Sequence, residues 1–290
     1  MTNGFLCNRR EMLKSAAGMG LAGLLSSGPL RPESKARSER RFKIGVCGWM
    51  LKSQTGPQLL EIAQRLGLDG VQLGMPYVED GCPLLKPEVQ QSYLAKAREL
   101  KMGIAGVALS ALSRVPYKSD PRAQQWVADS IAISRALKTR VVLVPFFGQA
   151  ADLKNDPKGT AVVIDRFKEI ASQAEKAGVI LGIESWLNAE EHMAILDKVG
   201  SPAVQVYYDM GNSHKMGYDI YKEIRFLGSH ISEFHAKDYD GLFGKGTIDF
   251  AEVRRAMDDI HYRGWIQIES GANEEEIGAN GRYLRSQFSS

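Results

Sequence analysis

The sequence predicts a (β/α)8 TIM barrel, the α/β fold in which eight parallel strands form a closed ring and each strand is followed by a helix. Short β-type apolar runs alternate with amphipathic stretches eight times over about 245 residues, beginning at Phe42. The chain of 290 residues is 44% hydrophobic and 24% charged, which is typical of one large globular domain. A doubly wound open sheet would show the same alternation, so closure of the ring is the feature that separates the two folds.

The predicted strands are runs in which Val, Ile, Leu and Gly are frequent, as expected of parallel strands that are buried on both faces. In chain order they cover residues 42–49, 70–74, 103–109, 140–146, 179–185, 204–209, 231–235 and 265–269. The helices delimited between them cover residues 57–66, 87–100, 121–137, 159–177 and 189–199. Proline stands where three of these helices begin, and glycine follows three of them where a helix commonly ends.

Residues 1–36 differ in composition from the rest of the chain. Arg9 and Arg10 precede residues 15–27, an uncharged stretch rich in Ala, Gly and Leu, which is typical of a signal peptide. This stretch is shorter than the roughly 20 residues that a membrane-spanning helix needs, so we expect no permanent membrane anchor. The arginine pair resembles a twin-arginine (Tat) export signal. We therefore expect a Tat-type signal peptide over residues 1–36, a barrel over residues 37–290, and export by the Tat machinery to the periplasm.

The net charge of the chain bears on its binding partners, and its cysteine content bears on disulfide bonds. Residues 1–36 hold five of the 37 Lys and Arg and two of the 34 Asp and Glu, so the remainder carries 32 of each. A barrel with no net charge gives no reason to expect a nucleic acid or another polyanion as partner. Beyond residue 36 only Cys47 and Cys82 remain, which do not make a disulfide framework in a domain of this size.

Four apolar runs in the second half of the chain each lead into a side chain that can bind a metal. The runs are LGIES, VQVYYD, ISEFH and WIQIES, and the four side chains are Glu184, Asp209, His235 and Glu269. In this fold the C-terminal ends of the strands meet at one edge of the barrel, so four neighbouring strand ends can converge on one ion. Three carboxylates and an imidazole suit a divalent cation, with Mn2+ first and Co2+, Mg2+ or Zn2+ as alternatives.

A divalent cation at such a site can assist proton transfer at a carbon next to a carbonyl. A divalent cation can polarise a carbonyl and the adjacent hydroxyl, which lowers the cost of removing the proton from the carbon between them. The resulting enediolate needs a base and an acid, and Glu184 and Glu269 are the candidates. Proton return to the opposite face of the same carbon gives epimerisation, and return to the other carbon gives aldose–ketose isomerisation.

On these residues, the chain resembles the sugar isomerase and epimerase superfamily with a xylose isomerase-like barrel. The resemblance covers residues 42–288 and is strongest over residues 182–249. In the ketose 3-epimerases of this superfamily, a Glu, an Asp, a His and a Glu from the last four strands hold the metal, and the two glutamates act as acid and base. The resemblance therefore implies the same roles for the four residues here, a carbohydrate substrate and a homo-oligomer.

The candidate substrate contacts include departures from the epimerase pattern. Asn212 stands three residues after the aspartate, where the epimerases typically have His, and His214 comes two residues later. Lys237 follows the histidine ligand, where the epimerases have an Arg nearby. An amide can hydrogen-bond a sugar hydroxyl, and an ammonium can hold an oxyanion. Trp49 and Trp186 can supply flat apolar walls for a sugar ring, or can simply pack at the rim.

Two other functions remain open on the sequence, and a third is disfavoured by the positions of the histidines. A lyase or hydratase acting on 3-keto-glycosides would form the same enolate from the same residues and then eliminate a leaving group in the β position. A non-catalytic sugar-binding protein would keep the barrel but would not need paired carboxylates. Endonuclease IV shares this barrel, but its three-metal cluster needs histidines from early strands, and none of the five histidines here ends one of the first four strands.

Overall fold

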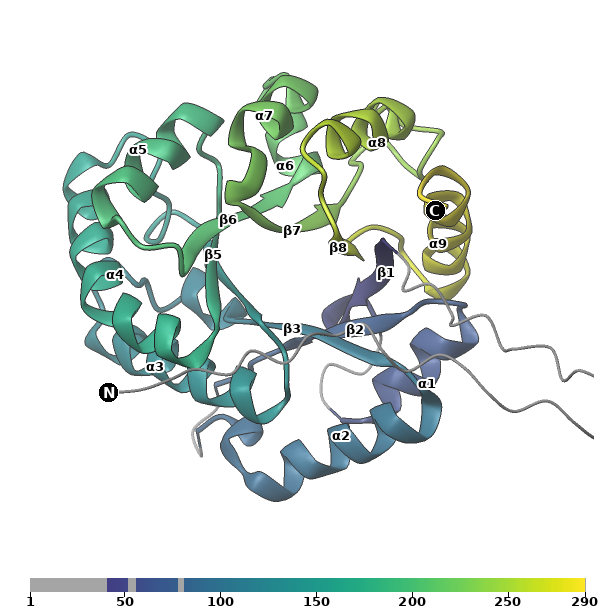
Figure 1. Cartoon of the computed structure of the whole chain (residues 1–290), viewed down its shortest axis with the longest axis horizontal. Coiled ribbons are helices and arrows are strands. Elements are labelled where there is room, and N and C mark those ends of the chain that lie inside the picture. Colours follow the sequence, from purple (N-terminus) through teal and green to yellow (C-terminus); the bar gives the residue numbers. More distant parts are fainter. Residues whose placement is uncertain (1–40, 52–55, 78–80, 290) are drawn as a thin grey trace, which may run out of the picture. The chain divides into compact units, whose positions relative to one another are not determined.

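Eight parallel strands close into a barrel in the computed structural model of the chain (Figure 1). The structure describes residues 41–51, 56–77 and 81–289. Pairing of the first and last strands closes the ring, with Phe42 opposite Gly264 and Val46 opposite Ile268. This closure confirms the predicted fold class and excludes the doubly wound sheet. The strands are β1 (Phe42–Cys47), β2 (Gly70–Gly74), β3 (Gly103–Ala108), β4 (Val141–Phe146), β5 (Ile180–Ser185), β6 (Val204–Asp209), β7 (Ile231–Ala236) and β8 (Gly264–Ile268).

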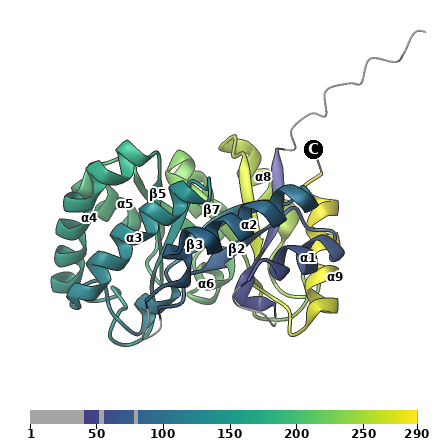
Figure 2. The ribbon, with the colours of Figure 1, turned by 90° about the horizontal axis from the view of Figure 1, so that it is seen from below.

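The α-helices lie outside the ring of strands (Figure 1, Figure 2). The five helices delimited from the sequence are found within two residues of their predicted ends. A helix follows most strands directly, whereas β6 is followed by two helices that the sequence did not delimit. The helices are α1 (Gln58–Arg65), α2 (Pro87–Leu100), α3 (Pro121–Ala136), α4 (Pro157–Ala177), α5 (Ala189–Val199), α6 (Met210–Lys215), α7 (Ile220–Leu227), α8 (Phe250–Asp259) and α9 (Glu274–Gln287).

Local sequence sets the ends of these elements. The β4 run VVLVPF is buried throughout, as a strand covered on both faces must be. At the start of α5, Asn188 and Glu191 form a reciprocal capping box that satisfies two backbone N–H groups. The same helix ends at Gly200, whose φ of 70° is a conformation that glycine adopts without steric cost.

Near the N-terminal ends of the strands, the side chain of Trp265 occupies part of the barrel interior. Trp265, from β8, lies so close to β2 and β3 that a Cβ on Gly70 or Gly103 would approach its indole to 2.6 Å. Glycine on these strands therefore makes room for a large side chain that reaches across from β8. Trp265 thus occupies part of the interior at the N-terminal end of the barrel, next to a cavity that it helps to line.

Two strand ends differ from the prediction in ways that matter for the site. Strand β1 ends at Cys47, and Trp49 lies in a single 3-10 turn (Gly48–Met50) that follows it. Strand β8 ends at Ile268, so Glu269 is the first residue beyond it. Both side chains thus sit at the rim, on the backbone that leaves the barrel.

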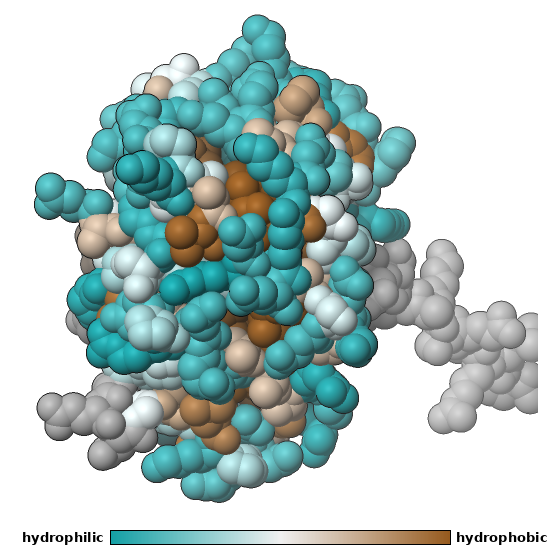
Figure 3. All heavy atoms as spheres, turned by 90° about the vertical axis from the view of Figure 1, so that its left-hand side faces the viewer, coloured by the Kyte–Doolittle hydropathy of each residue, from teal (hydrophilic) through white to brown (hydrophobic). Residues whose placement is uncertain are grey.

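The predicted signal peptide over residues 1–36 lies outside the described residues. Within the ranges that the structure describes, no helix combines the length and the apolar character that crossing a membrane requires. Figure 3 views the side of the barrel that carries α3, α4 and α5, where apolar side chains show between largely hydrophilic ones. A groove of about 540 Å³ lies between α4 and α5, and its apolar lining includes Ile164, Leu187 and Ile195.

Candidate active site

Four side chains from consecutive strands converge at the C-terminal end of the barrel. His235 Nδ1 lies 2.8 Å from Glu184 Oε1, 3.5 Å from Glu269 Oε2 and 3.8 Å from Asp209 Oδ2. One ligand atom from each of the four residues lies within 4.8 Å of each of the others. The structure thus brings together the four residues that the sequence singled out, as neighbours around the ring.

The local fold aims Asp209 at this cluster. Asp209 ends β6 and is also the N-cap of α6, where its Oδ1 accepts a hydrogen bond from the backbone N–H of Asn212 at 2.8 Å. Its second oxygen, Oδ2, is buried and has no hydrogen-bond partner among the described residues. A buried carboxylate oxygen without a hydrogen bond is costly, so its position calls for a positively charged ligand.

Burial and the neighbouring charges shift the pKa values of three side chains in the cluster. Burial raises the pKa of Glu184 to about 7, in spite of the nearby His235. Burial would lower the pKa of His235, but the negative charge around its ring, including that of Glu184 and Glu269, raises it well above its usual value. Burial would likewise raise the pKa of Asp209, but contact with His235 and the charge of Lys237 hold it below its usual value.

Lys237 supplies a second positive charge at the same place. Its Nζ lies 3.0 Å from Glu269 Oε2 and 3.9 Å from Asp209 Oδ2. Burial opposes the charged form, yet these two carboxylates raise the pKa of Lys237 above its usual value. The ammonium is therefore held as a cation against the carboxylates.

These donors fit a divalent cation. Three carboxylates and one imidazole nitrogen form a mixed oxygen and nitrogen set, which suits Mn2+, Co2+, Mg2+ or Zn2+. Oδ2 of Asp209, which accepts no hydrogen bond among the described residues, is directed into the same cluster. The imidazole must be neutral to bind a metal, so a cation would take the place of the proton that His235 Nδ1 now carries toward the carboxylates.

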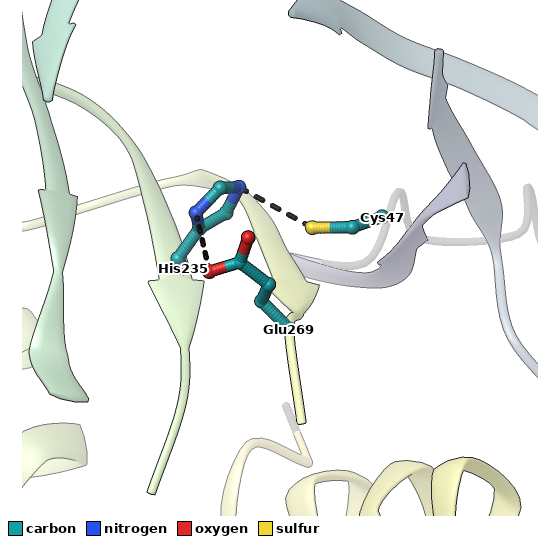
Figure 4. Close-up of side chains that lie close together, drawn as sticks. All are labelled: Cys47, His235 and Glu269. Carbon is teal, nitrogen blue, oxygen red and sulfur yellow. Dashed lines mark hydrogen bonds and ion pairs between the residues drawn. The ribbon is translucent and has the colours of Figure 1, made fainter. Parts of the chain in front are cut away.

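A second group that could hold a metal shares two of these residues and adds Cys47. Figure 4 shows that the two ring nitrogens of His235 face different partners, Nδ1 toward Glu269 and Nε2 toward Cys47. The Cys47 sulfur lies 3.3 Å from Nε2. Burial raises the pKa of Cys47 to about 12, so the thiol keeps its proton, and metal binding needs the thiolate. Nδ1 of His235, which faces the carboxylates, is therefore a better metal ligand here than Nε2, which faces Cys47.

A cavity of about 210 Å³ opens onto the cluster. Larger cavities of about 540 Å³ lie between α4 and α5 and at the N-terminal end of the barrel, away from the four ligands. We place the chemistry at the smaller cavity because it is the one that Glu184 and Glu269 of the cluster, together with Lys237, line. Its lining includes Trp49, Trp186, Asn212 and Lys237, four of the five predicted substrate contacts.

His214 lies elsewhere among the described residues. It projects from α6, and its Nε2 lies 2.9 Å from the hydroxyl of Thr247, outside the lining of the cavity. The short helix α6, which the sequence did not delimit, sets this direction. His214 as a substrate contact stays a prediction without support from its position.

Trp49 has a contact that the sequence did not indicate. Its indole N–H donates a hydrogen bond of 2.9 Å to Glu269 Oε1, so this ring holds a carboxylate as well as forming a wall. Sequence reasoning also missed Phe147 and Tyr239, which line the cavity. The Tyr239 hydroxyl donates to Asn212 Oδ1 at 2.7 Å. Both aromatic residues closely follow strand ends, which was the one signal that could have found them.

Comparisons with known proteins agree with the fold. The family described as "Xylose isomerase-like TIM barrel" matches residues 60–287. An L-ribulose-5-phosphate 3-epimerase of Salmonella paratyphi A is 24% identical over 256 residues, which cover 82% of this chain and 87% of that protein.

Solved structures share the architecture. The D-psicose 3-epimerase of Clostridium cellulolyticum H10, solved with D-tagatose, superposes with a TM-score of 0.71 at 18% identity, over 85% of this chain and 99% of that one. The 3-keto-D-glucoside 4-epimerase of E. coli superposes with a TM-score of 0.69 at 12% identity, over 84% of this chain and 99% of that one. At these identities the likeness shows the fold alone.

Proposed function

This chain belongs to the xylose isomerase-like TIM-barrel family, and on that premise we propose that it is a metal-dependent sugar isomerase or epimerase. The observation that carries the proposal is the convergence of Glu184, Asp209, His235 and Glu269 at the C-terminal end of the barrel. Family members with sugar 3-epimerase activity, such as the Salmonella paratyphi A relative, support the class of reaction.

The four residues would together hold one divalent cation, with Mn2+ first among the candidates. When bound, such an ion supplies Lewis acidity toward a carbonyl and its neighbouring hydroxyl. Oδ2 of Asp209, which accepts no hydrogen bond among the described residues, and the imidazole of His235 would bind the ion without a part in proton transfer. Glu184 and Glu269 would also exchange protons with the substrate.

Proton transfer is the part that this chain's own residues perform. Glu184 Oε1 and Glu269 Oε2 lie 2.8 Å and 3.5 Å from His235 Nδ1, so both carboxylates border the place of the cation, where a carboxyl group can take and return a substrate proton. Glu269 is held by the Trp49 indole and by Lys237, so its carboxylate is fixed in direction. A proton removed by one glutamate and supplied by the other on the opposite face inverts a carbon next to a carbonyl.

The lining of the cavity favours a neutral sugar. Its walls combine aromatic rings, among them Trp49, Phe147 and Trp186, with the hydroxyl groups of Ser110 and Ser113. Among the described residues that line it, Lys237 is the one cationic side chain, and Glu269 already engages it. A phosphate group would need more cationic donors than this one lysine, so we propose an unphosphorylated ketose or a related carbohydrate.

A lyase or hydratase acting on 3-keto-glycosides is the second candidate. Asn212 stands where ketose 3-epimerases typically carry His, so the group that contacts the sugar differs in kind. The fold likeness to an enzyme named for a 3-keto-D-glucoside gives this class of substrate a precedent on the same barrel. Export to the periplasm by the Tat pathway, which remains part of the proposal, would bring the chain into contact with glycosides.

Solvent deuterium incorporation tests both candidates. The chain lacking residues 1–36 is incubated in D2O with free ketoses and with 3-keto-glycosides, once loaded with Mn2+ and once stripped with EDTA, and the products are read by NMR. We expect metal-dependent label at a carbon next to the carbonyl. A C3 epimer or an isomer would establish the first candidate, and a released aglycone the second. Absence of label from the whole panel, by a protein that holds its metal, would overturn both.

A further inference from the structure

Gln72 contacts the metal-binding histidine from the side away from the carboxylates. It lies on β2, is fully buried, and its Oε1 is 2.9 Å from His235 Nε2. The opposite ring nitrogen, Nδ1, is the one that faces Glu184 at 2.8 Å. Gln72 is therefore placed to act on the cluster through His235 without touching the cation site.

A chain of buried hydrogen bonds fixes which end of the Gln72 amide faces the histidine. The Gln72 Nε2 donates to the Tyr207 hydroxyl at 3.1 Å, and that hydroxyl donates to Glu233 Oε2 at 3.3 Å. Since Tyr207 gives its proton to Glu233, it accepts from the amide NH2 group. In this arrangement the amide oxygen points at His235, and the Cys47 thiol is a second donor within reach of the same oxygen.

The direction of the amide decides the tautomer of the histidine. An oxygen next to His235 Nε2 can only accept, so Nε2 carries the proton and the neutral ring keeps its lone pair on Nδ1. A flipped amide would place its NH2 group against Nε2, and the proton of the neutral ring would then sit on Nδ1, among the carboxylates. The Cys47 sulfur, 3.5 Å from Gln72 Oε1, leaves this arrangement intact, because a thiol can donate to the same oxygen.

We propose that Gln72 is a positioning residue that selects the Nδ1-binding tautomer of His235, and that Tyr207 and Glu233 set the direction of its amide. The inference rests on the metal site of the proposed function. Partners of this kind on the far nitrogen of a metal-binding histidine fix the ring and raise its basicity. Gln72 would thus strengthen metal binding from a strand that contributes no ligand.

Two substitutions at Gln72 and one matched control test the inference by isothermal titration with Mn2+. Gln72→Met keeps the size of the side chain but removes the acceptor, and we expect Mn2+ affinity to fall about 10- to 100-fold. Gln72→Glu keeps an acceptor toward Nε2, and we expect it to retain most of the affinity. The control is Gln267→Met, a substitution of the other fully buried glutamine of the barrel strands, whose side chain has no hydrogen-bond partner among the described residues.

The outcomes separate this inference from the proposed function. Wild-type protein that binds no divalent cation would overturn both. Tight binding by wild type with no loss in Gln72→Met, or an equal loss in Gln267→Met, would overturn the role of Gln72 and leave the metal site standing. Should Gln72→Met fail to fold, 15N NMR of the Zn2+-loaded wild type decides: a proton on His235 Nε2 is expected, and an unprotonated Nε2 contradicts the inference.

Discussion

The two halves of the barrel present different side chains at the same rim. Strands β5 to β8 bring buried carboxylates and an imidazole to their ends, whereas β2 and β3 end in Gly74 and Ala108, and Phe147 follows β4. The fold offers eight equivalent positions around the ring, and the charged groups occupy four consecutive ones. The first half supplies walls and support instead, through Trp49 and Gln72. We call β5 to β8, with the residues that follow them, the chemical half of the barrel, and β1 to β4, with the residues that follow them, the supporting half.

Removing a proton-transfer group from the chemical half should have the largest effect. Glu184→Gln keeps the shape of the side chain but cannot accept or return a proton, so we expect turnover to fall by about 10²- to 10⁴-fold. Sugar affinity should change little. Steady-state kinetics on the sugar identified by deuterium labelling measures both values, with Glu190→Gln on the exposed start of α5 as the control. Full activity of Glu184→Gln would remove this residue from the mechanism.

Removing a ligand charge from the same half should chiefly weaken metal binding. Asp209→Asn keeps the N-cap of α6, since an amide oxygen can still accept from Asn212, but it loses the charge at Oδ2. We expect Mn2+ affinity to fall by more than about 100-fold, because the loss of a partner to a ligand alone costs up to that much. Titration gives the affinity, and a thermal melt of the metal-free protein should show little change. Unaltered affinity would exclude Asp209 as a ligand.

In the supporting half, Trp49 should matter through its N–H group. Trp49→Phe keeps an aromatic wall but removes the hydrogen bond to Glu269, and a bond to a charged group is worth roughly 1.5–3 kcal/mol. We expect turnover to fall by about tenfold or more. Trp186→Phe is the matched change in the chemical half: its ring packs edge-on against Phe147, and we expect mainly KM to respond. Equal effects in both variants would mean that Trp49 acts only as a wall.

The smallest effect should come from His214, which lies in the chemical half but outside the cavity. His214→Ala removes a contact with Thr247, so we expect kcat and KM to stay within about twofold of wild type. Asn212→Ala, two residues earlier and inside the cavity, should raise KM because it removes the amide that Tyr239 contacts. A large loss of activity in His214→Ala would show that α6 approaches the substrate and would contradict the placement of His214 outside the cavity.

The sequence predicted the chemical half better than the supporting half. Glu184, Asp209 and His235 could be found because each comes at or near the end of an apolar run, and strand direction then determines where their side chains meet. The contacts of Trp49 with Glu269 and of Gln72 with His235 could not be found, because each joins residues more than 160 positions apart. Such contacts exist only once β1 pairs with β8 and the ring closes.

Short elements were the other limit. The six-residue helix α6 carries no apolar period that a sequence pattern could register, yet it directs Asn212 into the cavity and His214 away from it. Its start was visible only as an aspartate whose side chain can cap a helix. The capping and ligand roles of Asp209 use different oxygens, and sequence alone does not separate them.

Anomalous diffraction at the manganese absorption edge tests the central claim most directly. Crystals of the chain lacking residues 1–36, grown with Mn2+, should show one strong anomalous peak between the carboxylates of Glu184, Asp209 and Glu269 and Nδ1 of His235. This result would place the cation in the half of the barrel that we assign to chemistry. A peak on the Cys47 side of the histidine ring, or no peak at either nitrogen, would contradict the account.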